Sequence, residues 1–144
     1  ISDGAAALTL MMADQAAEQG LKPIAIIHGY DESAQEPEWF TTAPVTAIQN
    51  TLKRVGWTLD EVDLWEINEA FAVVAMAAMR ELGISHEKLN VHGGACALGH
   101  PIGASGARIV VSLIHAMIRR GDKRGVASLC IGGGEATAMA IEII

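Results

Sequence analysis

Cysteines, basic residues and aromatic residues are all scarce in this 144-residue chain, and each shortage excludes a class of protein. Two cysteines are too few for the disulfide framework of a small secreted protein, so we expect free thiols and a reducing, cytoplasmic setting. Ten basic against seventeen acidic residues give a net charge of −7, which argues against a nucleic-acid partner. No uninterrupted apolar run approaches the roughly 18 residues of a membrane span, so none is expected.

The composition that remains is that of a protein with an aliphatic core. Hydrophobic residues make up 51% of the chain, charged residues 19% and aromatic residues only 4%. This length and composition suit about one folded domain. The chain opens with Ile-Ser-Asp-Gly, without a methionine or a targeting segment. We therefore expect residues 1–20 to end a preceding N-terminal domain and residues 21–144 to form a C-terminal domain.

Stretches typical of strands and helices alternate along the sequence. The apolar patterns and their glycine and proline boundaries predict strands at 5–12, 23–29, 62–67, 125–131 and 136–143, and helices ending near 19 or spanning 44–56, 71–82 and 102–120. Residues 30–43 are expected to form a surface loop. The alternation predicts an α/β layered domain with a mostly parallel sheet. Because only Gly132 to Gly134 separate the last two strands, this pair must be antiparallel and the sheet mixed.

A glycine-rich stretch, GGACALGHPIGASGA at 93–107, contains a thiol and an imidazole. The spacing of four between His92, Cys96 and His100 would suit a metal site on a helix, but the surrounding glycines and Pro101 would break that helix. No further ligand stands at the short spacing usual in zinc sites, so we expect no metal.

His100 has two open explanations. Pro101 biases it toward an extended backbone, the glycines allow close approach of a ligand, and a helix N-terminus follows. These features suit an imidazole that must meet a reacting group in a fixed geometry. A histidine that satisfies local backbone groups in a tight turn explains the same pattern equally well.

Two further residues stand at strand ends. Cys130 closes the strand before the three glycines, where it is either a small buried hydrophobe or a displayed thiol beside oxyanion-binding amides. Asn68 follows the strand VDLWEI and is either an ordinary helix cap or a ligand-binding residue at the carboxyl end of a strand. If these strands are parallel, Asn68, His100 and Cys130 should lie close together at one edge of the sheet.

Three motifs together resemble those of the thiolases, the acetyl-CoA C-acetyltransferases. They are NEAFA at 68–72, NVHGGACALGHPIGASGAR at 90–108 and CIGGG at 130–134, and ISDGAAAL also resembles the end of that family's N-terminal domain. The resemblance implies a layered α/β domain with a mixed five-stranded sheet and helices on both faces. It also implies an acyltransferase that forms or cleaves a carbon–carbon bond between acyl groups on coenzyme A, either acetoacetyl-CoA or another 3-ketoacyl-CoA.

The resemblance also implies a role for individual residues. His100 matches the base that activates the nucleophilic cysteine, and Cys130 matches the thiol that exchanges a proton with the α-carbon. Asn68 matches the residue that holds a water, which with His100 forms one oxyanion hole, and the Gly132 amide matches a donor in the other. Phe40 and Phe71 fall where the family lines its acyl pocket.

The same resemblance implies coenzyme A thioesters as substrates, no other cofactor, a partner N-terminal domain and a dimer or tetramer. That domain holds the family's nucleophilic cysteine, so this chain should supply half an active site. His92 and Glu135 depart from the residues that the family commonly has there. The alternative to an enzyme is a non-catalytic thiolase-like protein that binds acyl-CoA or lipid, although the intact Asn68 to Phe71 segment favours the enzyme.

Overall fold

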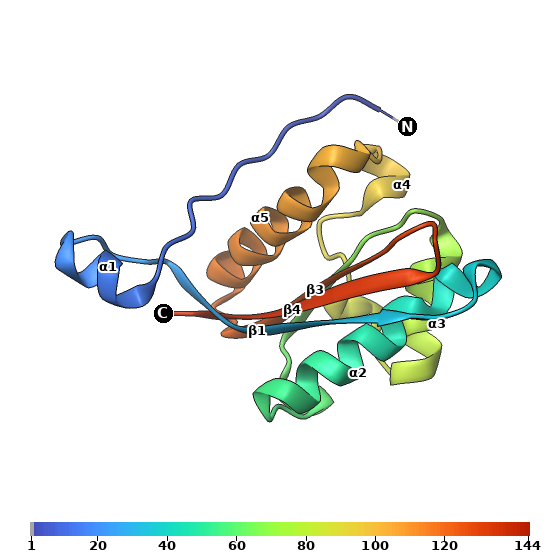
Figure 1. Cartoon of the computed structure of the whole chain (residues 1–144), viewed down its shortest axis with the longest axis horizontal. Coiled ribbons are helices and arrows are strands. Elements are labelled where there is room, and N and C mark those ends of the chain that lie inside the picture. Colours follow the sequence, from blue (N-terminus) through green and yellow to red (C-terminus); the bar gives the residue numbers. More distant parts are fainter. Residues whose placement is uncertain (1) are drawn as a thin grey trace.

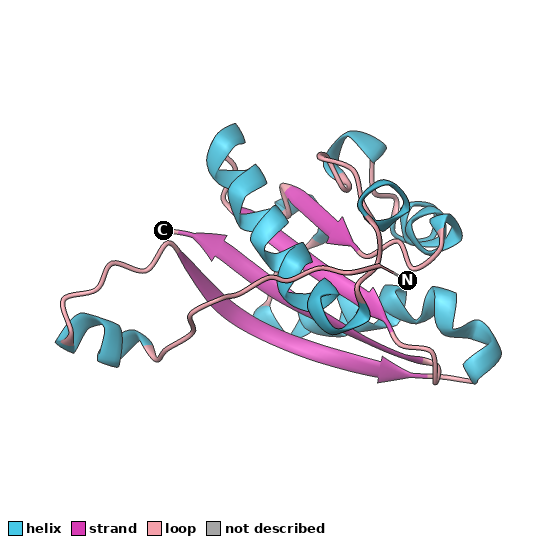
Figure 2. Cartoon of the chain, turned by 90° about the horizontal axis from the view of Figure 1, so that it is seen from above, coloured by secondary structure: helices cyan, strands magenta, loops and turns pink. Residues whose placement is uncertain are grey.

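A mixed sheet of four strands forms the middle layer of the computed structural model, which describes residues 2–144 (Figures 1 and 2). The strands are β1 (Ala25–Ala34), β2 (Leu64–Ile67), β3 (Arg124–Cys130) and β4 (Glu135–Ile143). Their order across the sheet is β1-β4-β3-β2. The β2–β3 pair is parallel, and β4 is antiparallel to both of its neighbours. The predicted mixed sheet, with an antiparallel last pair, is confirmed.

Helices cover both faces of this sheet, as predicted (Figure 1). Helices α2 (Ala43–Val55) and α3 (Ala72–Leu82) lie on one face, and α5 (Ile102–Arg120) lies on the other. The shorter helices are α1 (Ala13–Glu18), α4 (Ala95–Leu98) and the 3-10 turns η1 (Pro37–Thr42), η2 (Leu59–Glu61) and η3 (His86–Lys88). Each of the three long helices ends at a left-handed glycine, so the glycine stops in the sequence correctly marked their ends.

The sheet divides the hydrophobic core into two clusters. One lies between the sheet and the α2–α3 layer and includes Ile48, Val74 and Val126, all fully buried. The other lies under α5 and includes Leu113 and Met117, also fully buried. Helix α5 is long and apolar enough to cross a membrane by length and composition alone, but its buried residues pack on the sheet as those of a core helix do.

The fifth strand that the resemblance implied is reduced to one bridge. Leu89 forms an isolated parallel bridge with Trp65 at the free side of β2, and no ladder continues from it within residues 2–144. The next residue, Asn90, has a φ of 48°, which turns the chain out of the extended conformation. Pairing along this edge therefore stops after one residue, and the sheet has four strands rather than five.

Two further segments differ from the predictions. Residues 5–12 form no strand, because no neighbouring strand within residues 2–144 pairs with them; they run as an extended segment along α5 (Figure 1). The region expected as a surface loop at 30–43 instead contains the end of β1 and the turn η1, since β1 stays paired with β4 as far as Ala34 opposite Glu135.

Candidate functional site at the carboxyl end of the sheet

The carboxyl ends of β2 and β3 bring Asn68 and Cys130 to the same edge of the sheet. The two strands are parallel, with Ile67 opposite Ser128. The amide of Asn68 continues this pairing by donating to the carbonyl of Ser128 at 2.9 Å. Asn68 therefore lies beside Ser128 near the end of β3, two residues before Cys130, as its position after a strand predicted.

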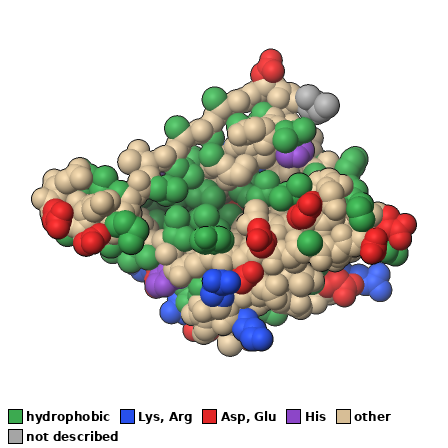
Figure 3. Space-filling model, in the orientation of Figure 1, with side chains coloured by type: hydrophobic (Ala, Val, Ile, Leu, Met, Phe, Trp, Pro, Cys, Tyr) green, Lys and Arg blue, Asp and Glu red, His purple; other side chains and the backbone are tan. Residues whose placement is uncertain are grey.

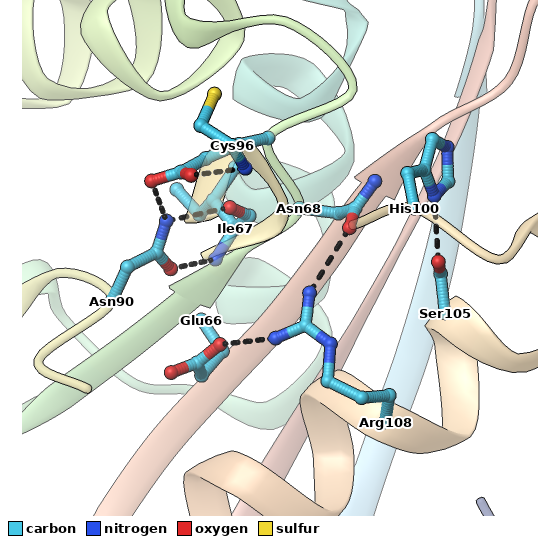
Figure 4. Close-up of polar contacts among 9 residues, drawn as sticks. Glu66, Ile67, Asn68, Asn90, Cys96, His100, Ser105 and Arg108 are labelled. Carbon is cyan, nitrogen blue, oxygen red and sulfur yellow. Dashed lines mark hydrogen bonds and ion pairs between the residues drawn. The ribbon is translucent and has the colours of Figure 1, made fainter. Parts of the chain in front are cut away.

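His100 reaches this edge from the loop that precedes α5. Pro101 follows it with an extended backbone (φ −75°, ψ 96°), and α5 begins at Ile102. The imidazole Nδ1 lies 2.6 Å from the Ser105 hydroxyl, which is fully buried one turn into the helix (Figure 4). The orientation of the His100 ring is therefore fixed by Ser105 of helix α5 and not by the loop alone.

The contacts of Ser105 favour one tautomer of His100. The Ser105 hydroxyl has one hydrogen and lies 3.1 Å from the carbonyl of Pro101, a common acceptor for a serine inside a helix. When the hydrogen is donated there, the hydroxyl accepts from Nδ1–H of His100, and the neutral ring carries its hydrogen on Nδ1. The lone pair of Nε2 is left to act as a base or, once protonated, as a donor.

A buried ion pair connects the sheet to α5 next to Asn68. Arg108 donates from Nη1 to Oε2 of Glu66 at 3.3 Å and from Nη2 to Oδ1 of Asn68 at 3.2 Å (Figure 4). Burial raises the pKa of Glu66 to about 7, with the Arg108 charge opposing that shift and the Glu69 carboxylate adding to it. Helix α5 therefore holds both Asn68, through Arg108, and His100, through Ser105.

A second network fixes the chain on either side of Asn68. The Asn90 side chain accepts from the amide of Ile67 and donates to its carbonyl, both at 2.9 Å, in the manner of a paired strand. It also donates to Glu69 at 3.1 Å, and the other oxygen of Glu69 accepts from the amide of Cys96 at 3.0 Å (Figure 4). The loop before His100 is thereby tied to the Asn68 segment.

Cys130 is brought to the edge, but its side chain leaves the sheet toward the α2–α3 layer. The residue is 8% exposed and belongs to the core cluster of that layer. No hydrogen bond joins it to Asn68 or His100 among residues 2–144. Burial raises the pKa of its thiol, only partly offset by a backbone hydrogen bond, so it is a neutral thiol at neutral pH.

The predicted acyl-pocket residues meet in this same layer. Phe40 from η1 and Phe71 before α3 contact edge to face, with ring centroids 6.1 Å apart. Phe40 packs against the cluster that contains Cys130, whereas Phe71 is 60% exposed. The two rings therefore lie on the same layer as the buried thiol, and their role in binding an acyl group stays a prediction.

The glycine turn after Cys130 leaves two amides available. The amides of Ile131 and Gly134 donate inside the turn, to Glu135 at 2.7 Å and to Ile131 at 3.1 Å. The exposed amides of Gly132 and Gly133 have no partner among residues 2–144 and are free to donate outward. The resemblance gave an oxyanion role to the Gly132 amide.

The sequence reading missed Glu66, Arg108, Asn90 and Ser105, which hold the predicted residues in place. One signal was present: a glutamate inside the short apolar strand at 62–67 needs a buried partner, and Arg108 interrupts the apolar face of the long helix. Cys96 is exposed, and its pKa is raised by partial desolvation and by Glu69. Residues 2–144 contain no group of three potential metal ligands.

Comparison with known proteins identifies the family of this chain. The family described as "Thiolase, C-terminal domain" matches residues 21–143. The chain belongs to the thiolase family. It is 54% identical over 142 residues to an acetyl-CoA acetyltransferase of Chromobacterium violaceum, covering 99% of this chain and 36% of that protein. It is 53% identical to acetyl-CoA acetyltransferase 1 of Arabidopsis thaliana, covering 100% of this chain and 35% of that protein.

Solved thiolase structures have the same fold. The acetyl-CoA acetyltransferase of Bacillus anthracis superimposes with a TM-score of 0.90 at 48% identity, over 93% of this chain and 34% of that one. Human mitochondrial 3-ketoacyl-CoA thiolase gives 0.89 at 44% identity, over 92% and 33%. The chain thus spans about a third of the length of the thiolases it matches.

Proposed function

We propose that this chain supplies the C-terminal half of a thiolase active site, which catalyses reversible Claisen condensation and thiolytic cleavage of acetoacetyl-CoA or another 3-ketoacyl-CoA. The observation that carries the proposal is the arrival of Asn68, His100 and Cys130 at one edge of the sheet in a chain of this family. Coenzyme A enters as a substrate thioester, and the proposed reaction uses no other cofactor.

In the cleavage direction, the nucleophilic cysteine of the N-terminal domain would attack the 3-keto carbonyl, and the bond between C2 and C3 would break. Nε2 of His100 would first accept the proton of that cysteine, because the hydrogen of the neutral ring is on Nδ1. The negative charge that develops on the thioester oxygen would be stabilised by an imidazolium N–H and a water on Asn68. The Gly132 amide would serve the second oxyanion.

Cys130 would then donate its proton to C2 of the enolate, which leaves as acetyl-CoA. A thiol whose pKa is raised by burial is protonated at neutral pH, so it is ready to act as an acid in this direction. In the condensing direction the thiol must first lose that proton, and the same raised pKa disfavours this step. The acyl group on the nucleophilic cysteine would finally be transferred to the sulfur of coenzyme A. The thiol proton of coenzyme A would restore Cys130, and the proton on His100 would return to the departing cysteine.

The exposed apolar surface supports a partner domain on the α5 side. Leu10 and Met12 in the N-terminal segment are each 67% exposed, and Ile102 at the start of α5 is 70% exposed. Figure 3 shows apolar side chains gathered in the hollow between this segment and α5. We propose that the N-terminal thiolase domain covers this surface and that the complete enzyme is a homo-oligomer. We also propose that it is cytoplasmic, because a mouse relative is named "Acetyl-CoA acetyltransferase, cytosolic".

The proposal is tested by incubating the complete enzyme, in which this chain is joined to its N-terminal domain, with acetoacetyl-CoA and coenzyme A. We expect the loss of each acetoacetyl-CoA to yield two molecules of acetyl-CoA. Saturable binding of the acyl-CoA without turnover would contradict the proposal and support the non-catalytic, acyl-CoA-binding alternative.

A further inference from the structure

The desolvation free energy of the buried ion pair between Glu66 and Arg108 is not offset by the hydrogen bonds that the pair makes. The two side chains are 2% and 18% exposed and contact each other through a single 3.3 Å bond. Oε1 of Glu66 and Nε of Arg108 are buried and have no partner among residues 2–144. A buried pair contributes stability only when its remaining donors and acceptors are satisfied. Stability is therefore a poor explanation for these charges, and a geometric role is a better one.

The guanidinium determines which way the Asn68 amide faces. An arginine side chain has only donors, so the atom of Asn68 that lies 3.2 Å from Nη2 must be the carbonyl oxygen Oδ1. The backbone of Asn68 is fixed separately by its bond to Ser128. With both ends of the residue held, the Nδ2 donor must point away from Arg108, as Figure 4 shows.

That donor is unused within the described chain. Asn68 is 1% exposed, and its Nδ2 is buried with no partner among residues 2–144. A buried amide donor without a partner is expensive, of the order of 1–3 kcal/mol, so it needs an external acceptor. A flipped amide would offer an acceptor on this side and place its NH₂ group against the Arg108 cation.

We propose that Arg108, anchored by Glu66, is a positioning residue that fixes the Asn68 amide with Nδ2 directed into the active-site edge. The inference rests on the proposed function, because the acceptor is then the water or oxyanion that Asn68 serves. Arg108 itself touches no reacting atom. It acts only through Asn68, and this distinguishes it from a residue that merely stabilises the fold.

A double-mutant cycle in the complete enzyme tests this directly. Arg108→Met should lower kcat for acetoacetyl-CoA thiolysis by about 10- to 100-fold, with little change in KM. The upper end of this range is the loss expected when one oxyanion donor is removed. In an Asn68→Ala background the same substitution should change kcat by less than about twofold, because the group it positions is gone. Additive losses in the two backgrounds would overturn the proposal, as would full activity of Arg108→Met.

Two further variants distinguish a loss of positioning from a loss of folding. Arg108→Lys keeps the charge, but lysine lacks the planar fork that reaches Glu66 and Asn68 together. If Arg108→Met fails to fold, Arg108→Lys replaces it in the cycle, and its loss of kcat should likewise disappear in the Asn68→Ala background. Arg124→Met breaks a surface pair with Glu61 of 2.7 Å at the other end of β3 and should leave kcat unchanged.

A readout independent of turnover separates this inference from the proposed function. In crystal structures of the complete enzyme, the Asn68 amide should keep its orientation in the wild type and lose it in Arg108→Lys. An inactive wild type with that result would refute only the proposed function. An unchanged Asn68 orientation in an active Arg108→Lys enzyme would refute the positioning role alone.

Discussion

Glu66 shows at the scale of one residue how the site affects stability. Its carboxyl group lies in a strand whose four residues are all buried, and this burial raises its pKa from 4.5 to about 7. The unfolded chain loses this proton near pH 4.5, whereas the folded chain retains it to about pH 7. Between these values the unfolded state binds fewer protons, so the stability of the fold decreases as the pH rises.

The corresponding variant is Glu66→Gln, which cannot ionise. A shift from 4.5 to about 7 corresponds to roughly 3 kcal/mol at about 1.4 kcal/mol per pKa unit. We expect the stability of Glu66→Gln relative to the wild type to increase by up to that amount between pH 4.5 and pH 8. Thermal unfolding of both proteins across this range measures it. A difference that does not change with pH would mean that Glu66 ionises at an ordinary pKa.

At the scale of elements, one side chain replaces a missing strand. Asn90 pairs with both backbone groups of Ile67 where the fifth strand would have continued, and it does so from a left-handed conformation that asparagine tolerates. The same residue contacts Glu69, which holds the loop leading to His100. Asn90 therefore ties its own loop to the end of β2 and, through Glu69, to the loop that leads to His100.

Asn90→Ala should accordingly be costly. It removes three hydrogen bonds at 2.9–3.1 Å and puts alanine at φ 48°, so we expect a loss of about 2–4 kcal/mol. Asn50→Ala is the matched control, because its exposed side chain makes one 3.3 Å bond to Glu32, and it should cost less than about 0.5 kcal/mol. Thermal melts compare them, and equal losses would contradict the role given to Asn90.

The turn after β3 gives a second contrast between neighbours. Gly134 has a φ of 101°, and a Cβ there would lie 2.2 Å from the carbonyl oxygen of Gln35, whereas a Cβ on Gly132 would meet nothing within 4 Å. Gly134→Ala should therefore destabilise the protein by about 1–3 kcal/mol, and Gly132→Ala by far less. Equal decreases in melting temperature for the two variants would contradict the idea that the close approach of Gln35 requires a glycine at position 134.

How much the sequence predicts differs between elements for physical reasons. The bounds predicted for α5, at 102–120, match the structure, because a long apolar period with a terminal glycine is a strong local signal. The strand at 5–12 was wrong, since an apolar run becomes a strand only where a partner offers a ladder. Strand ends correctly predicted which edge Asn68 and Cys130 share. Local patterns could not predict the bonds from α5, because a contact such as Arg108 to Glu66 spans 42 residues.

At the scale of the whole molecule, the proposed catalytic groups belong to two layers. Asn68 and His100 are held from the α5 layer, whereas the Cys130 thiol lies in the core cluster of the α2–α3 layer, against which Phe40 packs. Groups from both layers reach the carboxyl end of the sheet, where β2 and β3 end side by side. The central claim is that a substrate bound there uses groups from both, and the N-terminal domain would close the site from the α5 side.

Thiolysis of acetoacetyl-CoA by the complete enzyme carrying Cys130→Ala, Cys96→Ala or His100→Ala tests that claim most directly, with folding checked by thermal melts. We expect Cys130→Ala to lose about 10²- to 10⁴-fold in kcat, the usual contribution of a general acid or base. His100→Ala should lose at least as much, because it removes both the base and an oxyanion donor. Cys96→Ala should retain near-normal turnover. Near-normal turnover by Cys130→Ala with a large loss in Cys96→Ala would contradict the account.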